Sequence, residues 1–353
     1  MSKFWSPLAQ SLEPYVPGEQ PKDKKYVKLN TNENPYPPSP KAMAAMQAHV
    51  NSDLRLYPDP TCADLVQAAA DFYGVSPKQT FVGNGSDEIL ALAFMAFFDP
   101  AKPVMFPDIT YSFYKVYAKL CGLTPKLITL DEQFKLPIDL FAGNQSGIIL
   151  PNPNAPTAEL LPLSAIRTIL EQNRDQVVVI DEAYIDFGGE SAVSLINEYD
   201  NLLVIQTLSK SRALAGLRVG TAYGSEQLIE GLDRVKNSFN SYTLDRLALA
   251  GAIAAYEDRS YLETTVQKVV MTREWTKEQL IALGFTMTDS QANFLFITHE
   301  RVPAEQIFLQ LREKGVLVRY FKQPRIDNYL RVTIGTDEEM QVLVDGIREI
   351  VSK

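Results

Sequence analysis

Cysteine is almost absent from this chain of 353 residues, which contains only Cys62 and Cys121. The two lie far apart and lack the spacing of metal ligands, so we expect neither a disulfide framework nor a metal site. Sparse cysteine is typical of proteins in a reducing compartment. We therefore predict a cytoplasmic protein.

Histidine is equally scarce, with His49 in an alanine-rich stretch typical of a helix and His299 in the turn-like sequence THERVP. We expect both side chains at the surface. Histidine is the commonest general base in enzymes. If neither histidine is catalytic, proton transfer in an enzyme of this sequence falls to lysine, tyrosine or a carboxylate.

Positive charge and long apolar runs are lacking as well. The net charge of −9 and the pI near 5.0 argue against nucleic-acid and anionic-membrane partners. The longest apolar run, ILALAFMAFF, is much shorter than the ~18 residues that cross a bilayer. The N-terminal sequence MSKFWSPLAQSLEPY has no apolar core of signal-peptide length. We expect a globular protein.

The stretch NLLVIQTLSKSRALAGLRVGT, residues 201–221, carries the most chemistry. Its apolar first half predicts a buried strand that ends just before Lys210. A buried lysine tends to lose its proton and become a nucleophile. Thr207, Ser209 and Arg218 could hold a phosphate beside that amine, which suggests a Schiff base with pyridoxal phosphate. From this stretch alone, an ordinary strand-to-loop lysine is about as good an explanation.

A second phosphate site is indicated where Gly83-Asn84-Gly85-Ser86-Asp87-Glu88 joins a short predicted strand, 79–82, to an apolar helix. The first-turn amides of a helix are unpaired and lie at the positive end of its dipole, so they bind anions. Taken alone, the glycines also fit a plain tight turn.

Polar side chains follow several other predicted strands. Tyr111 comes after 103–106, Asn154 after 147–150, and Asp181 after the β-branched run 177–180. Alternating strands and helices predict a mostly parallel sheet flanked by helices, and ligands of such sheets bind at the carboxyl ends of the strands. The residue types leave core packing open for Tyr111, but their convergence at one sheet edge favours a site.

The chain length predicts about two domains. We expect a proline-rich arm over 1–38, a large α/β domain over 39–244 and a small α+β domain over 245–353. The small domain has long predicted helices at 245–256 and 260–284, and strands at 293–297, 315–320 and 329–334. Two of these strands carry Arg319 and Arg331, which could close over an anionic substrate.

Together these motifs resemble the fold-type I, aspartate-aminotransferase-like pyridoxal-phosphate aminotransferases. The closer resemblance is to the histidinol-phosphate aminotransferases of the class II subfamily, and it covers essentially the whole chain. The closer match rests on four further segments: Pro14-Tyr15-Val16-Pro17-Gly18, Leu29-Asn30-Thr31-Asn32-Glu33-Asn34-Pro35, Tyr57-Pro58 and Leu330-Arg331-Val332-Thr333-Ile334-Gly335-Thr336.

The resemblance implies a role for each motif residue. Lys210 would form the Schiff base and carry the proton, Asp181 would pair with the pyridine nitrogen, and Tyr184 would bind the phenolic oxygen. Tyr111 would stack on the ring, and Tyr57 would reach the phosphate from the second subunit of a homodimer. The other cofactor-binding residues implied are Gly85, Ser86, Asp87, Asn154, Thr207, Ser209 and Arg218, and the substrate-binding residues are Tyr15, Asn32, Arg319 and Arg331.

The chain departs from the family motif at Ala155 and Ala158, where the family usually has asparagine and glycine. Either Asn154 replaces the missing asparagine, or Tyr184 acts alone on the phenolic oxygen.

The reaction that the resemblance implies is ping-pong transamination in histidine biosynthesis. L-Histidinol phosphate and 2-oxoglutarate would give imidazole acetol phosphate and L-glutamate. The alternatives on the same scaffold are an aromatic-amino-acid transaminase and a phosphothreonine-type decarboxylase. A non-catalytic cofactor-binding protein is a third alternative, which the paired Lys210 and Asp181 disfavour.

Overall fold

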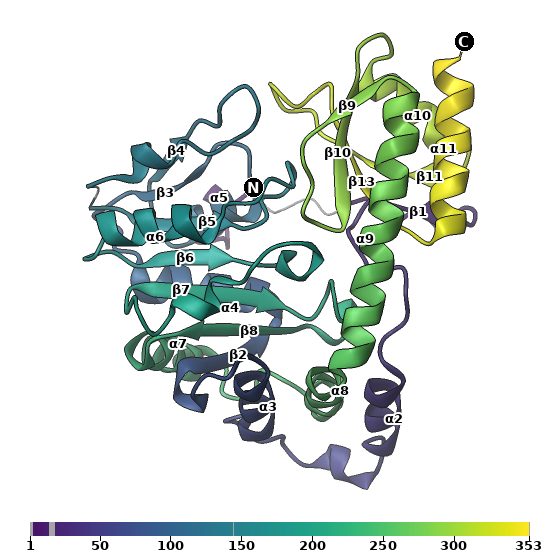
Figure 1. Ribbon diagram of the computed structural model, residues 1–353. Helices are drawn as coiled ribbons and strands as arrows, with labels where there is room; N and C mark the ends of the chain where they lie inside the picture. Colours follow the sequence, from purple (N-terminus) through teal and green to yellow (C-terminus); the bar gives the residue numbers. More distant parts are fainter. Residues whose placement is uncertain (1–2, 14–17, 144, 353) are drawn as a thin grey trace.

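A computed structural model describes residues 3–13, 18–143 and 145–352 (Figure 1). Its central element is a seven-stranded sheet of order β2-β8-β7-β6-β5-β3-β4. β8 runs in the opposite direction to the other six strands, so its pairs with β2 and β7 are antiparallel. The remaining adjacent pairs are parallel, and the sheet is therefore mostly parallel, as predicted. The strands are β2 Thr80–Asn84, β3 Val104–Pro107, β4 Pro125–Ile128, β5 Gly147–Pro151, β6 Val178–Asp181, β7 Leu202–Thr207 and β8 Val219–Gly224.

Helices cover both faces of this sheet, which explains the continuous apolar runs of its strands. In β6, Val178 and Ile180 pack on one face while Val179 packs on the other. The first face carries α2 Pro40–Ala48, α3 Ala63–Tyr73, α6 Leu163–Gln172 and α8 Arg246–Glu257. The second face carries α4 Gly85–Phe97, α5 Phe113–Leu120 and α7 Glu226–Phe239.

A second, antiparallel sheet of order β12-β13-β10-β9 lies beside the first (Figure 1). Its strands are β9 Phe285–Met287, β10 Phe294–His299, β12 Arg319–Tyr320 and β13 Leu330–Thr333. The helices α9 Arg259–Ala282, α10 Ala304–Glu313 and α11 Asp337–Val351 pack with it. The α+β character predicted for the C-terminal part is therefore confirmed.

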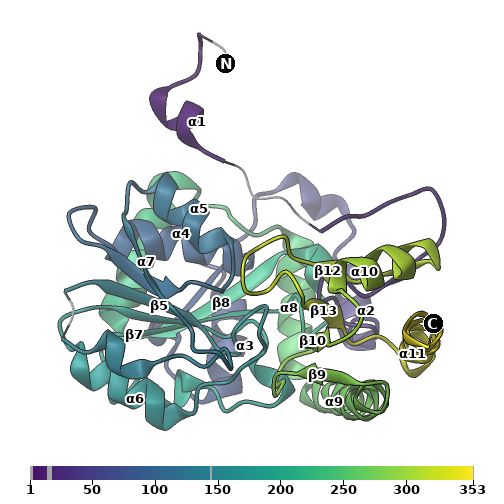
Figure 2. The same cartoon turned by 90° about the horizontal axis from the view of Figure 1, so that it is seen from above.

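The predicted arm contains two short elements. Near its start, α1 Pro7–Ser11 stands away from the rest of the molecule in Figure 2. Further on, β1 Val27–Lys28 pairs with β11 Val316–Leu317 in a separate two-stranded parallel sheet, so this part of the arm lies against the C-terminal part of the chain. The described 3₁₀ helices are η1 Ser52–Arg55, η2 Pro77–Gln79, η3 Ile138–Phe141, η4 Ile185–Phe187, η5 Ala192–Leu195 and η6 Ala215–Leu217.

The expectation that both histidines lie at the surface is wrong for His299, which is 3% exposed. Its Nδ1 accepts the backbone N–H groups of Arg301 and Val302, and its Nε2 lies 3.2 Å from the Leu283 carbonyl oxygen. The ring therefore organises the turn after β10. His49 is exposed, as expected.

Over the part of the chain that the structure describes, no helix combines the length and apolarity needed to cross a membrane.

Candidate active site

The predicted site residues converge on a cavity of about 290 Å³ at the carboxyl ends of the central strands. The large sheet supplies one wall, and residues of the arm and of β12 and β13 supply the other. The predicted residues that line it are Asn32, Ser86, Asp87, Tyr111, Asp181, Tyr184, Thr207, Ser209, Lys210, Arg218, Arg319 and Arg331.

Lys210 lies in the turn after β7, where the strand delivers it to the cavity wall. Its Nζ donates a hydrogen bond to the Thr31 carbonyl oxygen at 3.2 Å. Burial lowers the pKa of Lys210 to about 8, and the cation of Arg331 acts in the same direction. A substantial fraction of the amine is therefore neutral, and thus nucleophilic, near physiological pH.

Asp181, the last residue of β6, lines the cavity, and its two carboxylate oxygens differ in their partners. Its Oδ2 accepts a hydrogen bond from the Tyr114 hydroxyl at 2.7 Å. Its Oδ1 is buried and has no hydrogen-bond partner among the described residues. Burial raises the pKa of Asp181 to about 6. A cationic N–H donor placed here would satisfy Oδ1 and favour the ionised carboxylate, which fits a protonated pyridine ring.

Tyr184 is positioned from the arm. Its hydroxyl accepts a hydrogen bond from Asn32 Nδ2 at 2.9 Å. Asn32 is itself fixed, since Thr333 Oγ1 accepts its backbone N–H at 3.0 Å and donates to its Oδ1 at 3.1 Å. Burial raises the pKa of Tyr184, so the phenol keeps its proton and can donate a hydrogen bond.

At one end of the cavity, the first turn of α4 meets Arg218. Arg218 Nη2 lies 2.8 Å from Asp87 Oδ2, and its Nη1 donates to Ser209 Oγ at 3.4 Å. Gly85 adopts a φ of +75°, and a Cβ built on it would lie 2.7 Å from Arg218 Nη2. Glycine therefore lets the guanidinium lie close to the unpaired amides, which together make an anion site.

Arg319 and Arg331 lie at the other end, where they pair across β12 and β13. Their guanidinium carbons lie 5.6 and 5.7 Å from the Phe321 ring. Arg331 Nη2 also donates to the Asn30 carbonyl oxygen at 3.0 Å. Two oriented cations beside an aromatic ring form a second anion-binding end.

Some predicted residues do not reach the cavity. Asn154 is absent from its lining. Its Nδ2 donates to Ile109 O and Thr157 Oγ1 at 3.0 and 2.8 Å, and its Oδ1 accepts from Thr110. Ala155 lines the cavity instead. Tyr57 is 77% exposed and stacks on Tyr242 at 4.5 Å, away from the cavity.

Tyr15 lies outside the described residues.

Sequence reasoning missed Tyr114 and Glu33. Tyr114 is fully buried in α5 and donates a hydrogen bond to Asp181. The sequence feature that could have indicated it is the aromatic segment SFYKVY, which follows the end of a strand. Glu33 lines the cavity, where its carboxylate pairs with Lys28 at 2.7 Å and accepts from the Thr31 hydroxyl.

Comparison with known proteins places this chain in a family. The family model described as aminotransferase class I and II matches residues 24–347. Histidinol-phosphate aminotransferase from Clostridium acetobutylicum is 59% identical over 352 residues, covering 100% of both chains. Histidinol-phosphate aminotransferase from Marinomonas sp. is also 59% identical, covering 99% of this chain and 100% of its own.

Solved structures agree on the fold. Histidinol-phosphate aminotransferase from Sinorhizobium meliloti, in complex with pyridoxal-5'-phosphate, has a TM-score of 0.91 at 22% identity, covering 100% of this chain and 98% of its own. Aspartate aminotransferase from Thermotoga maritima has a TM-score of 0.80 at 21% identity, covering 94% and 93%. The predicted fold-type I architecture is thereby confirmed. This chain belongs to the class I and II aminotransferase family.

Proposed function

We propose that this protein is a histidinol-phosphate aminotransferase of histidine biosynthesis. It interconverts L-histidinol phosphate plus 2-oxoglutarate with imidazole acetol phosphate plus L-glutamate. The observation that carries the proposal is 59% identity, over essentially full length, to relatives of that name. A cavity with anion-binding groups at two ends and a lysine between them supports it.

The cofactor is pyridoxal 5'-phosphate. When bound, it supplies an aldehyde that takes up the amino group and an electron-poor ring that withdraws charge from the substrate Cα. The anion site of Ser86, Ser209 and Arg218 would hold its phosphate, and Tyr111 would cover its ring. The unpartnered Oδ1 of Asp181 is the group best suited to its ring nitrogen.

Three residues carry the chemistry on the protein side. Lys210, with its lowered pKa, would accept the proton from the substrate Cα and return it to the aldehyde-derived carbon of the cofactor, on the other side of the transferred nitrogen. Asp181 would keep the ring nitrogen protonated through its charge and a hydrogen bond. Tyr184, whose hydroxyl is oriented by Asn32, would donate a hydrogen bond to the phenolic oxygen of the cofactor.

Arg319 and Arg331 bind the anionic end of each substrate in turn. A guanidinium fork accommodates the phosphate of histidinol phosphate and a carboxylate of 2-oxoglutarate or glutamate with similar geometry. This shared chemistry allows one site to serve both halves of a ping-pong reaction.

The active enzyme is proposed to be a cytoplasmic homodimer in which Tyr57 of one subunit reaches the phosphate of the cofactor bound to the other subunit. The exposed Tyr57 ring supports this, as do the exposed apolar side chains of Leu54, Leu56 and Phe239. Free cysteines at 62 and 121 suit a reducing compartment. The division into an arm, a large domain and a small domain remains a prediction.

A half-reaction experiment tests the proposal. Holoenzyme is mixed with L-histidinol phosphate in the absence of a keto acid, and the visible absorbance of the bound cofactor is followed. The absorbance should fall rapidly and return when 2-oxoglutarate is added. An unchanged spectrum with histidinol phosphate, but bleaching with phenylalanine, would favour an aromatic-amino-acid transaminase. Release of carbon dioxide from phosphothreonine would favour the decarboxylase.

A further inference from the structure

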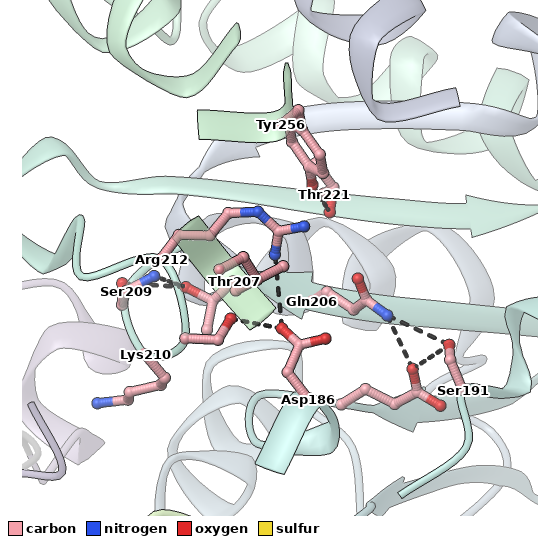
Figure 3. A network of polar contacts seen from close by, with 12 residues as sticks. Asp186, Ser191, Gln206, Thr207, Ser209, Lys210, Arg212, Thr221 and Tyr256 are labelled. Atoms are coloured by element: carbon pink, nitrogen blue, oxygen red, sulfur yellow. Dashed lines mark hydrogen bonds and ion pairs between the residues drawn. The ribbon is translucent and has the colours of Figure 1, made fainter. Parts of the chain in front are cut away.

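Outside the cavity, one carboxylate joins the two loops that carry the reactive groups. Asp181 and Tyr184 lie on the segment that leads into η4, which contains Asp186. Asp186 Oδ2 accepts a hydrogen bond from the Ser211 hydroxyl and lies 3.5 Å from Arg212 Nη1. Ser211 and Arg212 directly follow Lys210, so Asp186 ties the Lys210 loop to the Asp181 loop (Figure 3).

Arg212 is an unusual residue to find two positions beyond the reactive lysine. Its side chain is 3% exposed, and its guanidinium carbon lies 4.7 and 4.4 Å from the rings of Phe72 and Tyr256. Its Nε and Nη2 have no hydrogen-bond partner within the described ranges of the chain. A buried guanidinium is costly unless it is paired, so Asp186 and the two rings hold this cation in one place.

The Lys210 backbone is held from the other side by the arm. Asn34 Nδ2 donates to the carbonyl oxygens of Lys210 and Ser211 at 3.0 and 3.1 Å. In Figure 3 the Lys210 amine is directed away from Asp186. Neither Asp186, Ser211 nor Arg212 lines the cavity, so these contacts hold the backbone next to Lys210 without placing their own side chains in the site.

We propose that Asp186, acting through Ser211 and Arg212, is a positioning residue that sets Lys210 at the distance needed for proton transfer at the substrate Cα. The inference rests on the proposed transaminase function. A displacement of about 1 Å in a reacting group can cost ~10²-fold in rate, so loss of this contact should slow the proton-transfer step more than substrate or cofactor binding.

Asp186→Asn and Ser211→Ala test this in the holoenzyme. Asp186→Asn keeps the shape of the side chain but removes the charge opposite Arg212. Ser191→Ala is the matched control, since the Ser191 hydroxyl also donates to a carboxylate, that of Glu182, and accepts from Gln206, but among the described contacts it is bonded to neither Ser211 nor Arg212.

The readouts are kcat, KM for L-histidinol phosphate, cofactor affinity and the isotope effect with substrate deuterated at the amine-bearing carbon. We expect Asp186→Asn to lower kcat by about 10–100-fold and to enlarge the isotope effect, with KM and cofactor affinity within about twofold of wild type. Ser211→Ala should show the same pattern, more weakly, and Ser191→Ala should behave as wild type. The double variant should be no slower than Asp186→Asn, because both changes break one linkage.

A lowered melting temperature with unchanged kcat and isotope effect in both variants would show a purely structural role and overturn the inference. Decreases in kcat no larger than that of Ser191→Ala would also overturn the inference. Should Asp186→Asn fail to fold, Ser211→Ala carries the test. A wild-type enzyme inactive on histidinol phosphate would instead refute the proposed function, so the two failures are distinguishable.

Discussion

Replacing Gly220 with alanine should damage the proposed phosphate site without replacing any residue that would contact the phosphate. Gly220 lies in β8, paired with Gly83 and Thr207 on the flanking strands. A Cβ at this position would lie 2.5 Å from both Gly85 C and Ser86 N. These are backbone atoms of the first turn of α4, so no side-chain rotation can relieve the clash.

The size of the effect follows from that distance. Ordinary Cβ contacts begin at 3.4 Å, so α4 or β8 must shift by about 0.9 Å. Such a shift lengthens a typical amide–oxygen hydrogen bond of about 2.9 Å enough to lose it. A hydrogen bond to a charged group contributes about 1.5–3 kcal/mol, so we expect the dissociation constant of pyridoxal phosphate to rise by about 10–150-fold. Strain should lower the free energy of unfolding by about 1–3 kcal/mol.

The assay is a titration of apoprotein with pyridoxal phosphate, alongside denaturant unfolding. Gly216→Ala is the control, because Gly216 directly follows Ala215, which lines the cavity, but a Cβ on Gly216 would meet nothing within 4 Å. Gly216→Ala should bind cofactor as wild type does. Cofactor affinity within about threefold of wild type in Gly220→Ala would refute the assignment of the phosphate to this end of the cavity.

Three further predictions concern the reacting groups. Lys210→Ala should lower kcat by at least about 10³-fold because it removes the proton carrier, and wild-type turnover would contradict that role. Asp181→Asn should lower kcat by about 10²-fold with little change in KM, since a neutral amide cannot stabilise a protonated ring; steady-state kinetics with both substrates would measure this. Only the neutral amine reacts with the cofactor aldehyde, so with a Lys210 pKa of about 8 the rate of cofactor uptake by apoprotein should rise about tenfold from pH 7 to pH 9. A rate that is flat across this range, followed by stopped-flow absorbance, would be inconsistent with such a pKa.

The sequence was most informative where topology alone decides position. Parallel strands buried on both faces have continuous apolar runs, as in β6 and β7, and their carboxyl ends must share one sheet edge. For that reason the strand pattern alone predicts that Asp181 and Lys210 lie together. β8 was missed because its sequence, VGTAYG, has two glycines and no continuous β-branched run. Gly220 is needed for the close approach of β8 to α4, whereas a Cβ at Gly224 would lie 3.0 Å from the Leu202 carbonyl oxygen on the neighbouring strand, and only the fold reveals these contacts.

Side-chain direction could not be predicted in the same way, because it depends on contacts made far along the chain. The turn-like sequence around His299 predicted a surface position. The ring is buried instead, and its two nitrogens contact backbone groups of Leu283 and Arg301. Tyr114 looked like one of several aromatic residues in a helix, and only its bond to Asp181 separates it from the others.

The direction of the Asn154 side chain decides which residue can bind the phenolic oxygen of the cofactor. The sequence left two candidates for the phenolic oxygen of the cofactor, Asn154 after a loop shift or Tyr184 alone. Both hydrogens of the Asn154 amide are already donated, and Ala155 occupies the cavity wall. Freeing Asn154 would break buried hydrogen bonds at a cost of about 1 kcal/mol or more each. Tyr184 needs no such rearrangement, because its hydroxyl accepts from Asn32 and keeps its own proton to donate. The geometry therefore favours Tyr184 as the side chain that donates to the phenolic oxygen, with its hydroxyl oriented by Asn32.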